Sequence, residues 1–380
     1  MEKLERLLEE QIKLNRYRTL LSIQNQRDGF IYIENKKYVD FSSNDYLGLS
    51  QHPAIKKAAV VAIKKFKNST CSSRLLSGNL ELFNMLEERM ANFKKKEAGL
   101  VFNSGYQANV GIISCLCSRD DVIFSDKLNH ASIIDGIILS GAKFFRFRHN
   151  DIGHLEDLLK KERYKFKNSL IIVETIFSMD GDKAPLKQLV KLKEKYNSIL
   201  MVDEAHATGI FGKNGSGVVE EEDVSEKVDI IMGTFSKALG CFGAYVACSK
   251  KFKEYFVNFC RSFIYSTALP PSIINSCLES LVIVKKEPHR RKRLLENASY
   301  LHKKLKNTGF NAIGCSQIVP VIIGEEKETI NLSIKLKENG FWVPAIRPPT
   351  VLKGSCRLRF SLNYYHTKDI LDKLIDVLVN

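Results

Sequence analysis

The chain has 380 residues, of which 44% are hydrophobic and 27% are charged, a balance typical of a globular enzyme with a large core. The chain has 58 Lys and Arg and 43 Asp and Glu, which gives a net charge of +15. This charge could attract an anionic ligand or could only keep the protein soluble, and it does not distinguish between the two. The sequence has no apolar run near the roughly 18 residues that span a bilayer, no signal-peptide core and no nucleic-acid-binding motif. We therefore expect a cytoplasmic protein with neither a membrane nor a nucleic-acid partner.

The N-terminal residues predict an amphipathic helix. Leu4, Leu7, Leu8 and Ile12 form an apolar stripe at helical spacing among charged residues. We expect residues 1–45 to comprise this helix and a segment that packs on a small C-terminal domain or on a partner subunit.

From about residue 99 to 249, short β-branched or aromatic runs alternate with segments of helical periodicity. Such alternation predicts a mainly parallel sheet covered by helices on both faces. We therefore expect a large α/β domain over residues 46–285. Its seven strands are predicted from the runs GLVFNSG, DVIFSD, AKFFRFRH, SLIIVET, SILMVDEA, VDIIMGTF and GAYVACS.

After about residue 250 the pattern changes. Helical stretches dominate through residue 308, and they are followed by three strand-like runs, with a helix between the first two and another at the end. We expect a small α+β domain over residues 286–380. Its strand candidates are QIVPVIIG, FWVPAIR and CRLRFSLN.

Polar residues follow five of the predicted parallel strands. In open parallel sheets, ligands bind at the carboxyl ends of the strands, so these residues are candidates for one site. They include Ser104, Gly105, Tyr106, Asp126, His130, Glu174, Ser178, Asp203, His206, Thr234 and Lys237.

Three features of this set point to one cofactor. A lysine at the end of a strand that is partly shielded from water would have a lowered pKa and could form a Schiff base with an aldehyde; Lys237 is the candidate, although a surface lysine would also fit the position. Asp203 could hold a pyridinium nitrogen, or it could be a helix cap or a structural ion pair. A helix that opens at Gly105 after Ser104, together with the hydroxyl of Thr234, could bind a phosphate. Together these groups favour pyridoxal 5′-phosphate (PLP), and no metal site is expected.

At this point the sequence resembles the α-oxoamine synthase family of fold-type I PLP-dependent enzymes. The resemblance covers nearly the whole chain. It rests on the motifs FSSNDYLGLS, SRLLSGNLEL, FNSGYQAN, DKLNHASIIDG, ETIFSMDGDKAPL, MVDEAHATGIFG, GTFSKALG, IYSTALPP and AIRPPT.

The resemblance implies a role for each candidate residue. Lys237 would carry PLP as a Schiff base and then act as the base, and His130 would stack on the ring as the second catalytic residue. The cofactor would also be bound by Ser104, Gly105, Tyr106, Ser178, Asp203, His206 and Thr234. The substrates would be bound by Arg18, Asn44, His130, Thr350 and Arg359. Strand alternation places Arg357 on the same face as Arg359, so the residues alone do not choose between the two arginines.

Within this family, AIRPPT and YSTALPP favour the decarboxylative condensation of L-alanine with a pimeloyl thioester, of coenzyme A or of acyl carrier protein, in biotin biosynthesis. A glycine C-acetyltransferase, a 5-aminolevulinate synthase and a basic nucleic-acid-binding protein are the alternatives. The family implies a homodimer with shared active sites. Two departures from the family pattern are Ser-Thr-Cys-Ser-Ser at 69–73, where many relatives are glycine-rich, and Phe83, where many have histidine.

Overall fold

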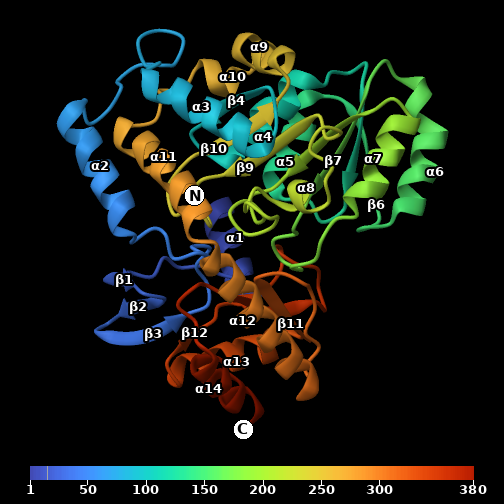
Figure 1. Ribbon diagram of the computed structural model, residues 1–380. Helices are drawn as coiled ribbons and strands as arrows, with labels where there is room; N and C mark the ends of the chain where they lie inside the picture. Colours follow the sequence, from blue (N-terminus) through green and yellow to red (C-terminus); the bar gives the residue numbers. More distant parts are fainter. Residues whose placement is uncertain (15) are drawn as a thin grey trace. The chain divides into compact units, whose positions relative to one another are not determined.

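The computed structural model describes residues 1–14 and 16–380 (Figure 1). These residues form two compact units, which we describe separately. The larger unit comprises residues 49–178 and 183–291, and the smaller unit comprises the described part of residues 1–48 together with residues 179–182 and 292–380. The domain boundaries expected from the sequence, after residues 45 and 285, remain a prediction.

The larger unit is built on one seven-stranded sheet, and all seven strands expected from the sequence are present. The strand order is β4-β10-β9-β8-β7-β5-β6, and the ladders from β9 to β6 are parallel, whereas β10 runs antiparallel to both of its neighbours. The expected mainly parallel sheet is therefore confirmed. The strands are β4 (Ala98–Phe102), β5 (Val122–Asp126), β6 (Lys143–Phe147), β7 (Ser169–Glu174), β8 (Ile199–Asp203), β9 (Ile230–Thr234) and β10 (Ala244–Cys248).

Burial explains why these strands could be recognised in the sequence. Every residue of β4, β5, β7, β9 and β10 is buried, because both faces of the sheet are covered. Their sequences are consequently almost continuous apolar runs. β6 lies at the edge of the sheet, and only Phe147 of this strand is buried.

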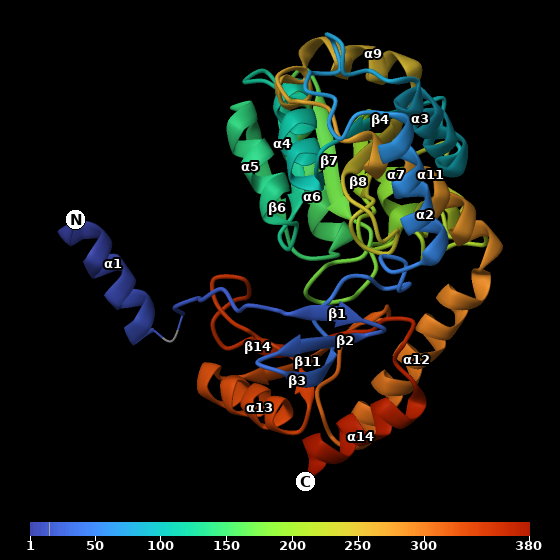
Figure 2. The same cartoon turned by 90° about the vertical axis from the view of Figure 1, so that its left-hand side faces the viewer.

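Helices cover the sheet of the larger unit. Figure 2 shows α4 (Gly105–Leu116) and α5 (Ala131–Ser140) on one side of the strands, and α2 (Pro53–Lys65), α3 (Glu81–Lys94) and α11 (Pro271–Lys286) on the other. Ser104 and His130 are the N-caps of α4 and α5, so both helices begin directly after the loops that leave the sheet. The remaining helices are α6 (Ile152–Glu162), the 3₁₀ helix η1 (Arg163–Lys165), α7 (Leu186–Lys195), α8 (Val218–Glu221), α9 (Lys250–Phe259) and α10 (Arg261–Ile264).

The smaller unit contains two sheets. The first has the order β1-β2-β3-β12 and the second has the order β11-β14-β13. The run FWVPAIR, expected as one strand, is divided between them, since β12 pairs with β3 and β13 pairs with β14. Its elements are α1 (Glu2–Lys13), β1 (Asn25–Arg27), β2 (Phe30–Ile33), β3 (Lys36–Asp40), most of α12 (Pro288–Asn307), β11 (Ile318–Gly324), α13 (Glu326–Glu338), β12 (Phe341–Trp342), β13 (Ala345–Ile346), β14 (Cys356–Ser361) and α14 (Lys368–Val379).

The expected N-terminal helix is α1, which stands away from the sheets of its own unit (Figure 2). None of its residues is buried, and its apolar stripe is exposed. Among the helices described, none combines the length and the apolar character needed to cross a membrane.

Candidate active site

The larger unit has a cavity of about 170 Å³ where β7, β8 and β9 end and α4 and α5 begin. The topology explains this position, because the carboxyl ends of parallel strands open at the same edge of a sheet. Seven of the residues expected to bind a cofactor line the cavity: Gly105, Tyr106, His130, Asp203, His206, Thr234 and Lys237. Ser104 and Ser178 are not among its lining residues, and Ser104 instead caps α4 by accepting a hydrogen bond from the backbone N–H of Gln107 at 3.2 Å.

Asp203 is the last residue of β8, and both of its carboxylate oxygens are fixed by hydrogen bonds. Oδ1 accepts from the backbone N–H of Ala205 at 2.8 Å, and Oδ2 accepts from Nδ2 of Asn109 at 3.0 Å. Asp203 is only 5% exposed, and it lines the cavity. A buried carboxylate held in this way presents a negative charge in a fixed orientation, which is what a protonated ring nitrogen needs as a partner.

Sequence reasoning did not find Asn109, although the cavity lining includes it. Asn109 lies one helical turn after Gly105 on α4, and residues four apart share a face of a helix. The periodicity could therefore have identified it once Gly105 was assigned to the site. Its partner, Asp203, lies 94 positions away in the chain, and that contact leaves no local signal.

Lys237 lies on a loop that connects β9 to β10. Thr234 and Ala244, which flank this loop, pair directly in the antiparallel ladder. Within the loop, the backbone N–H of Gly240 donates to the carbonyl of Lys237 at 2.8 Å, and the N–H of Cys241 donates to the carbonyl of Phe235 at 2.9 Å. The loop is therefore closed and internally bonded, and it places Lys237 in the cavity lining.

His130, the N-cap of α5, contributes an imidazole to the cavity lining. Although the residue is exposed, desolvation by the surrounding atoms lowers its pKa, and the positive charge of Lys237 acts in the same direction while Asp203 opposes it. Nδ1 of His130 lies 2.8 Å from the hydroxyl oxygen of Ser132 and accepts the backbone N–H of Ser132 at 3.2 Å. The ring therefore favours its neutral form.

Glu174, the last residue of β7, pairs in register with Asp203 and is 2% exposed. Burial raises its pKa well above the usual value, and the negative charge of Asp203 raises it further, while Lys237 opposes both effects. The sequence placed Glu174 at a strand end without giving it a role, whereas the structure places it in the cavity lining. The site therefore holds a second carboxyl group that favours its protonated form.

Three buried polar atoms of the lining have no hydrogen-bond partner among the described residues. They are the hydroxyl of Thr234, Oδ1 of Asn109 and Oε1 of Glu174. Buried polar groups are rarely left unsatisfied, so three in one cavity indicate a ligand with complementary polar groups. Gly105 adds space, because a Cβ at this position would lie 2.7 Å from Cγ2 of Thr234. The hydroxyl of Thr234 and the free N–H groups at the start of α4 are donors that fit the phosphate of PLP, while Lys237 and Asp203 fit its aldehyde and its ring nitrogen.

The expected substrate-binding residues other than His130 lie in the smaller unit, where the structure brings them together in two pairs. Arg18 donates from Nη2 to the hydroxyl of Thr350 at 3.2 Å. Arg359 places Nη2 3.3 Å from Oδ1 of Asn44 and 3.3 Å from the hydroxyl of Tyr46. Tyr46 was not expected, although it lies two residues after Asn44 in the motif FSSNDYLGLS.

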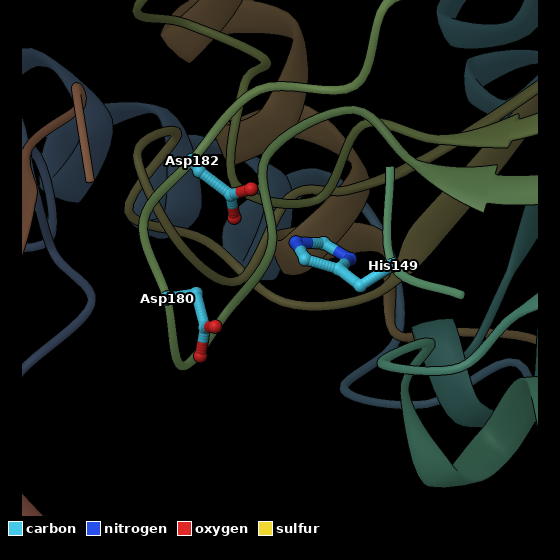
Figure 3. Close-up of side chains that lie close together, drawn as sticks. All are labelled: His149, Asp180 and Asp182. Carbon is cyan, nitrogen blue, oxygen red and sulfur yellow. The ribbon is translucent and has the colours of Figure 1, made fainter. Parts of the chain in front are cut away.

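The structure distinguishes the two arginines of β14. Arg357 is bonded to the carboxylate of Asp180 and to the carbonyl of Met179, so its guanidinium is already occupied by an acidic partner. Asp180 is drawn in Figure 3 on the loop that follows β7, together with Asp182. His149, the third residue drawn, lies with Nδ1 2.9 Å from Oδ1 of Asp126 within the larger unit. The contacts described above for Arg359 are instead with the neutral side chains of Asn44 and Tyr46.

The departure at Phe83 has a local explanation. Its ring is fully buried on α3 and lies 4.1 Å beneath the guanidinium carbon of Arg74, which also pairs with Glu87 at 2.8 Å. The aromatic ring thus supports a buried arginine through a cation–π contact.

With this geometry established, the chain can be compared with known proteins. The family model of aminotransferase class I and II matches residues 36–378. The chain belongs to this family.

Curated relatives narrow the type of enzyme. Two proteins, from Bacillus cereus (strain AH820) and Bacillus anthracis, are provisionally named 8-amino-7-oxononanoate synthase, and each is 47% identical over 363 residues. In both cases the match covers 95% of this chain and 91% of the relative.

Solved structures agree with this family assignment. Sphingomonas wittichii serine palmitoyltransferase superposes with a TM-score of 0.94 at 30% identity, over 99% of this chain and 96% of that one. The S. paucimobilis serine palmitoyltransferase with a bound PLP–myriocin adduct gives a TM-score of 0.91 at 30% identity, over 99% and 96% of the two chains. An 8-amino-7-oxononanoate synthase from Francisella tularensis gives 0.79 at 32% identity, over 90% and 97%. The expected fold-type I architecture and the expected PLP-dependent α-oxoamine synthase type, with PLP as cofactor, are confirmed.

Proposed function

We propose that this protein condenses L-alanine with a pimeloyl thioester to form 8-amino-7-oxononanoate, with release of carbon dioxide and the free thiol, as a step of biotin biosynthesis. The observation that carries the proposal is the 47% identity, over 95% of the chain, to relatives provisionally given that activity. The cavity that gathers Lys237, Asp203 and His130 supports it. The thioester carrier would be coenzyme A or acyl carrier protein, and the net charge of +15 suits either acidic partner.

The residues of the cavity would divide the work of holding PLP. When bound, PLP supplies an electron sink for the carbanion formed at the amino acid's α-carbon. Lys237 would attach the cofactor through Nζ and would then hold the proton taken from the α-carbon. Asp203 would hold the ring nitrogen and His206 the ring oxygen. Thr234, Ser104, Gly105 and Tyr106 would hold the phosphate end, and Ser178 would complete the cofactor-binding set.

The substrate-binding roles would fall to His130 and the smaller unit. Arg359 would bind the carboxylate of alanine, because a guanidinium offers two parallel donors to a carboxylate and because Arg357 is already bonded to Asp180. Asn44, 3.3 Å from Arg359, would orient that guanidinium and contact the substrate. Arg18 and Thr350, which bond each other, would contact the acyl substrate. His130 would lie against the cofactor ring and the bound amino acid.

We also propose that the active form is a cytoplasmic homodimer with shared active sites. Several large apolar side chains are exposed on the single chain, and a second copy could cover them. They include Leu4, Leu8 and Ile12 on α1 and, in the larger unit, Leu76, Phe242 and Tyr265.

A spectroscopic titration tests the proposed substrate. Purified protein loaded with PLP would be titrated in turn with alanine, glycine and serine, and the change of the visible absorption band would be recorded. A response to alanine in preference to the others, followed by thiol release from a pimeloyl thioester, is expected. Preference for glycine would instead indicate a glycine C-acetyltransferase or a 5-aminolevulinate synthase. Lys237→Ala serves as the control, since this variant should fold normally and show no turnover.

A further inference from the structure

A chain of hydrogen bonds runs behind the cavity from Asp203 to His130. Nδ2 of Asn109 donates to Oδ2 of Asp203 at 3.0 Å and to the hydroxyl oxygen of Ser132 at 2.9 Å. The hydroxyl of Ser132 lies 2.8 Å from Nδ1 of His130. Asn109 and Ser132 are each 1% exposed and line the same cavity as the two residues they connect.

The direction of each bond in this chain is fixed by its chemistry. A carboxylate only accepts, so the amide of Asn109 must turn its NH₂ group toward Asp203. The same NH₂ group donates its other proton to Ser132, whose hydroxyl then has its own proton free to donate to His130. Nδ1 of His130 already accepts the backbone N–H of Ser132 at 3.2 Å, so it cannot carry a proton of its own. The remaining ring proton must be on Nε2.

We propose that Asn109 and Ser132 are positioning residues that link the carboxylate of Asp203 to the imidazole of His130 and hold that ring neutral, with its proton on Nε2. Protonation of Nδ1 would break the hydrogen bond from the backbone N–H of Ser132, turn an N–H toward that N–H, and reverse the bond with the Ser132 hydroxyl. The other charged group that faces the ring, Lys237, also disfavours an imidazolium ion, whereas Asp203 favours it. Tyr106 packs edge-on against the ring at 6.5 Å between centroids, and its hydroxyl is bonded to Asp135 rather than to His130.

The consequence for catalysis rests on the proposed function. If His130 lies on the cofactor ring while Asp203 holds the ring nitrogen, the two groups contact the same conjugated ring. Asn109 and Ser132 would fix both of them through a single continuous network, so that a disturbance at one end reaches the other. A neutral imidazole also leaves the positive charge of the site to Lys237 and the ring nitrogen.

The direct test needs neither PLP nor substrate. Apoprotein labelled with ¹⁵N-histidine would be titrated by NMR, and His130 would be assigned by comparison with His130→Gln. We expect the wild-type ring to be neutral near pH 7 with its proton on Nε2. In Ser132→Ala the pKa of His130 should shift upward and the preference for Nε2 should weaken, and Ser132→Thr, which keeps the hydroxyl, should restore both. A wild-type ring that is protonated on Nδ1, or a Ser132→Ala spectrum identical to wild type, would overturn the proposal.

A matched control removes a serine hydroxyl outside the network. Ser114 lies on α4 and bonds only to the carbonyl of Gly111 of the same helix among its contacts found in the described residues. Ser114→Ala should leave the pKa and tautomer of His130 unchanged. In the PLP-loaded enzyme, Ser132→Ala should lower kcat/KM by about tenfold, the equivalent of one hydrogen bond, and move the acidic limb of its pH profile upward. If wild-type protein failed to bind PLP at all, the proposed function would be contradicted. The NMR titration would still test whether Asn109 and Ser132 set the protonation state and tautomer of His130.

Discussion

Glu174 and Asp203 end neighbouring parallel strands and stand opposite each other in the ladder, so two carboxyl groups share one buried edge of the sheet. Asp203 has a hydrogen-bond donor on each oxygen, whereas Oε1 of Glu174 has none among the described residues. Two carboxyl groups this close do not both ionise readily. Burial, together with the negative charge of Asp203, raises the pKa of Glu174, so Glu174 is the group that retains its proton more readily.

Glu174→Gln is predicted to change the pH dependence of stability. The pKa of Glu174 is raised in the folded protein, so the stability that its neutral form provides is complete below the unfolded value of about 4.5 and is lost as the pH rises toward the folded value. The isosteric amide does not ionise, so the variant should gain stability over wild type as the pH rises from 5 to 8. Urea unfolding of the apoproteins measures this difference. Glu88→Gln, which alters an exposed carboxylate of the same unit, should show the same dependence of the free energy of unfolding on pH as wild type. A curve for Glu174→Gln that runs parallel to the wild-type curve from pH 5 to 8 would contradict the prediction.

Arg359→Lys is predicted to raise the KM for alanine by about tenfold, because an ammonium group replaces a two-pronged guanidinium and loses about one charge-assisted hydrogen bond. The KM for the thioester should change much less. Arg357→Lys is the matched comparison on the same strand face, and since that residue is bonded to Asp180, its alanine KM should stay within about twofold of wild type. Steady-state kinetics with each substrate varied in turn decides between the two arginines.

Lys94→Met is predicted to destabilise the protein strongly. Nζ of Lys94 lies 2.6 Å from Oε2 of Glu204, and the two side chains are 1% and 0% exposed. Removing the lysine leaves a buried carboxylate unpaired, at a cost of about 3–5 kcal/mol in the free energy of unfolding. The double variant Lys94→Met/Glu204→Leu should recover part of that loss, because neither charge remains. A single variant as stable as wild type in urea unfolding would show that the pair is not buried in solution.

Gly105→Ala is predicted to weaken PLP binding while the fold stays intact. The added Cβ would lie 2.7 Å from Cγ2 of Thr234, so it would displace the side chain whose hydroxyl faces the cavity. We expect an increase in the dissociation constant for PLP of about tenfold or more, equivalent to one lost hydrogen bond. Gly309→Ala is the control, because a Cβ there meets no atom within 4 Å, although its φ of +85° imposes some strain of its own. Fluorescence titration of the apoproteins with PLP gives both constants.

The sequence identified the seven strands of the large sheet because burial on both faces makes their signal strong and local. It did not identify the sheet formed by β1, β2, β3 and β12, whose short strands carry exposed charged residues such as Lys36 and Lys37. It also treated FWVPAIR as one strand, whereas the segment between Trp342 and Ala345 separates two strands that join different sheets.

The candidate site shows the same division between local and long-range information. Lys237, Asp203 and Thr234 could be predicted because each lies at the end of a recognisable strand or within three residues of it. Asn109 and Ser132 were missed as functional residues, and Glu174 was placed at the site without a role, since the contact between Asn109 and Asp203 and the register of Glu174 with Asp203 join residues distant in the sequence. The preference for Arg359 over Arg357 in the proposed function rests in the same way on Asp180, which comes from another part of the chain.

The closed loop between β9 and β10 has a consequence for how the lysine is held. Its two ends meet at one rung of the ladder, Thr234 opposite Ala244, and its interior is crossed by its own backbone hydrogen bonds. The backbone of Lys237 is therefore already ordered before the cofactor binds. The conformational entropy of this segment is lost during folding, so little more is lost on cofactor binding. The amine of Lys237 would then reach the cofactor by side-chain rotation alone, because the loop that carries it is anchored to β9 and β10, in which every residue is buried.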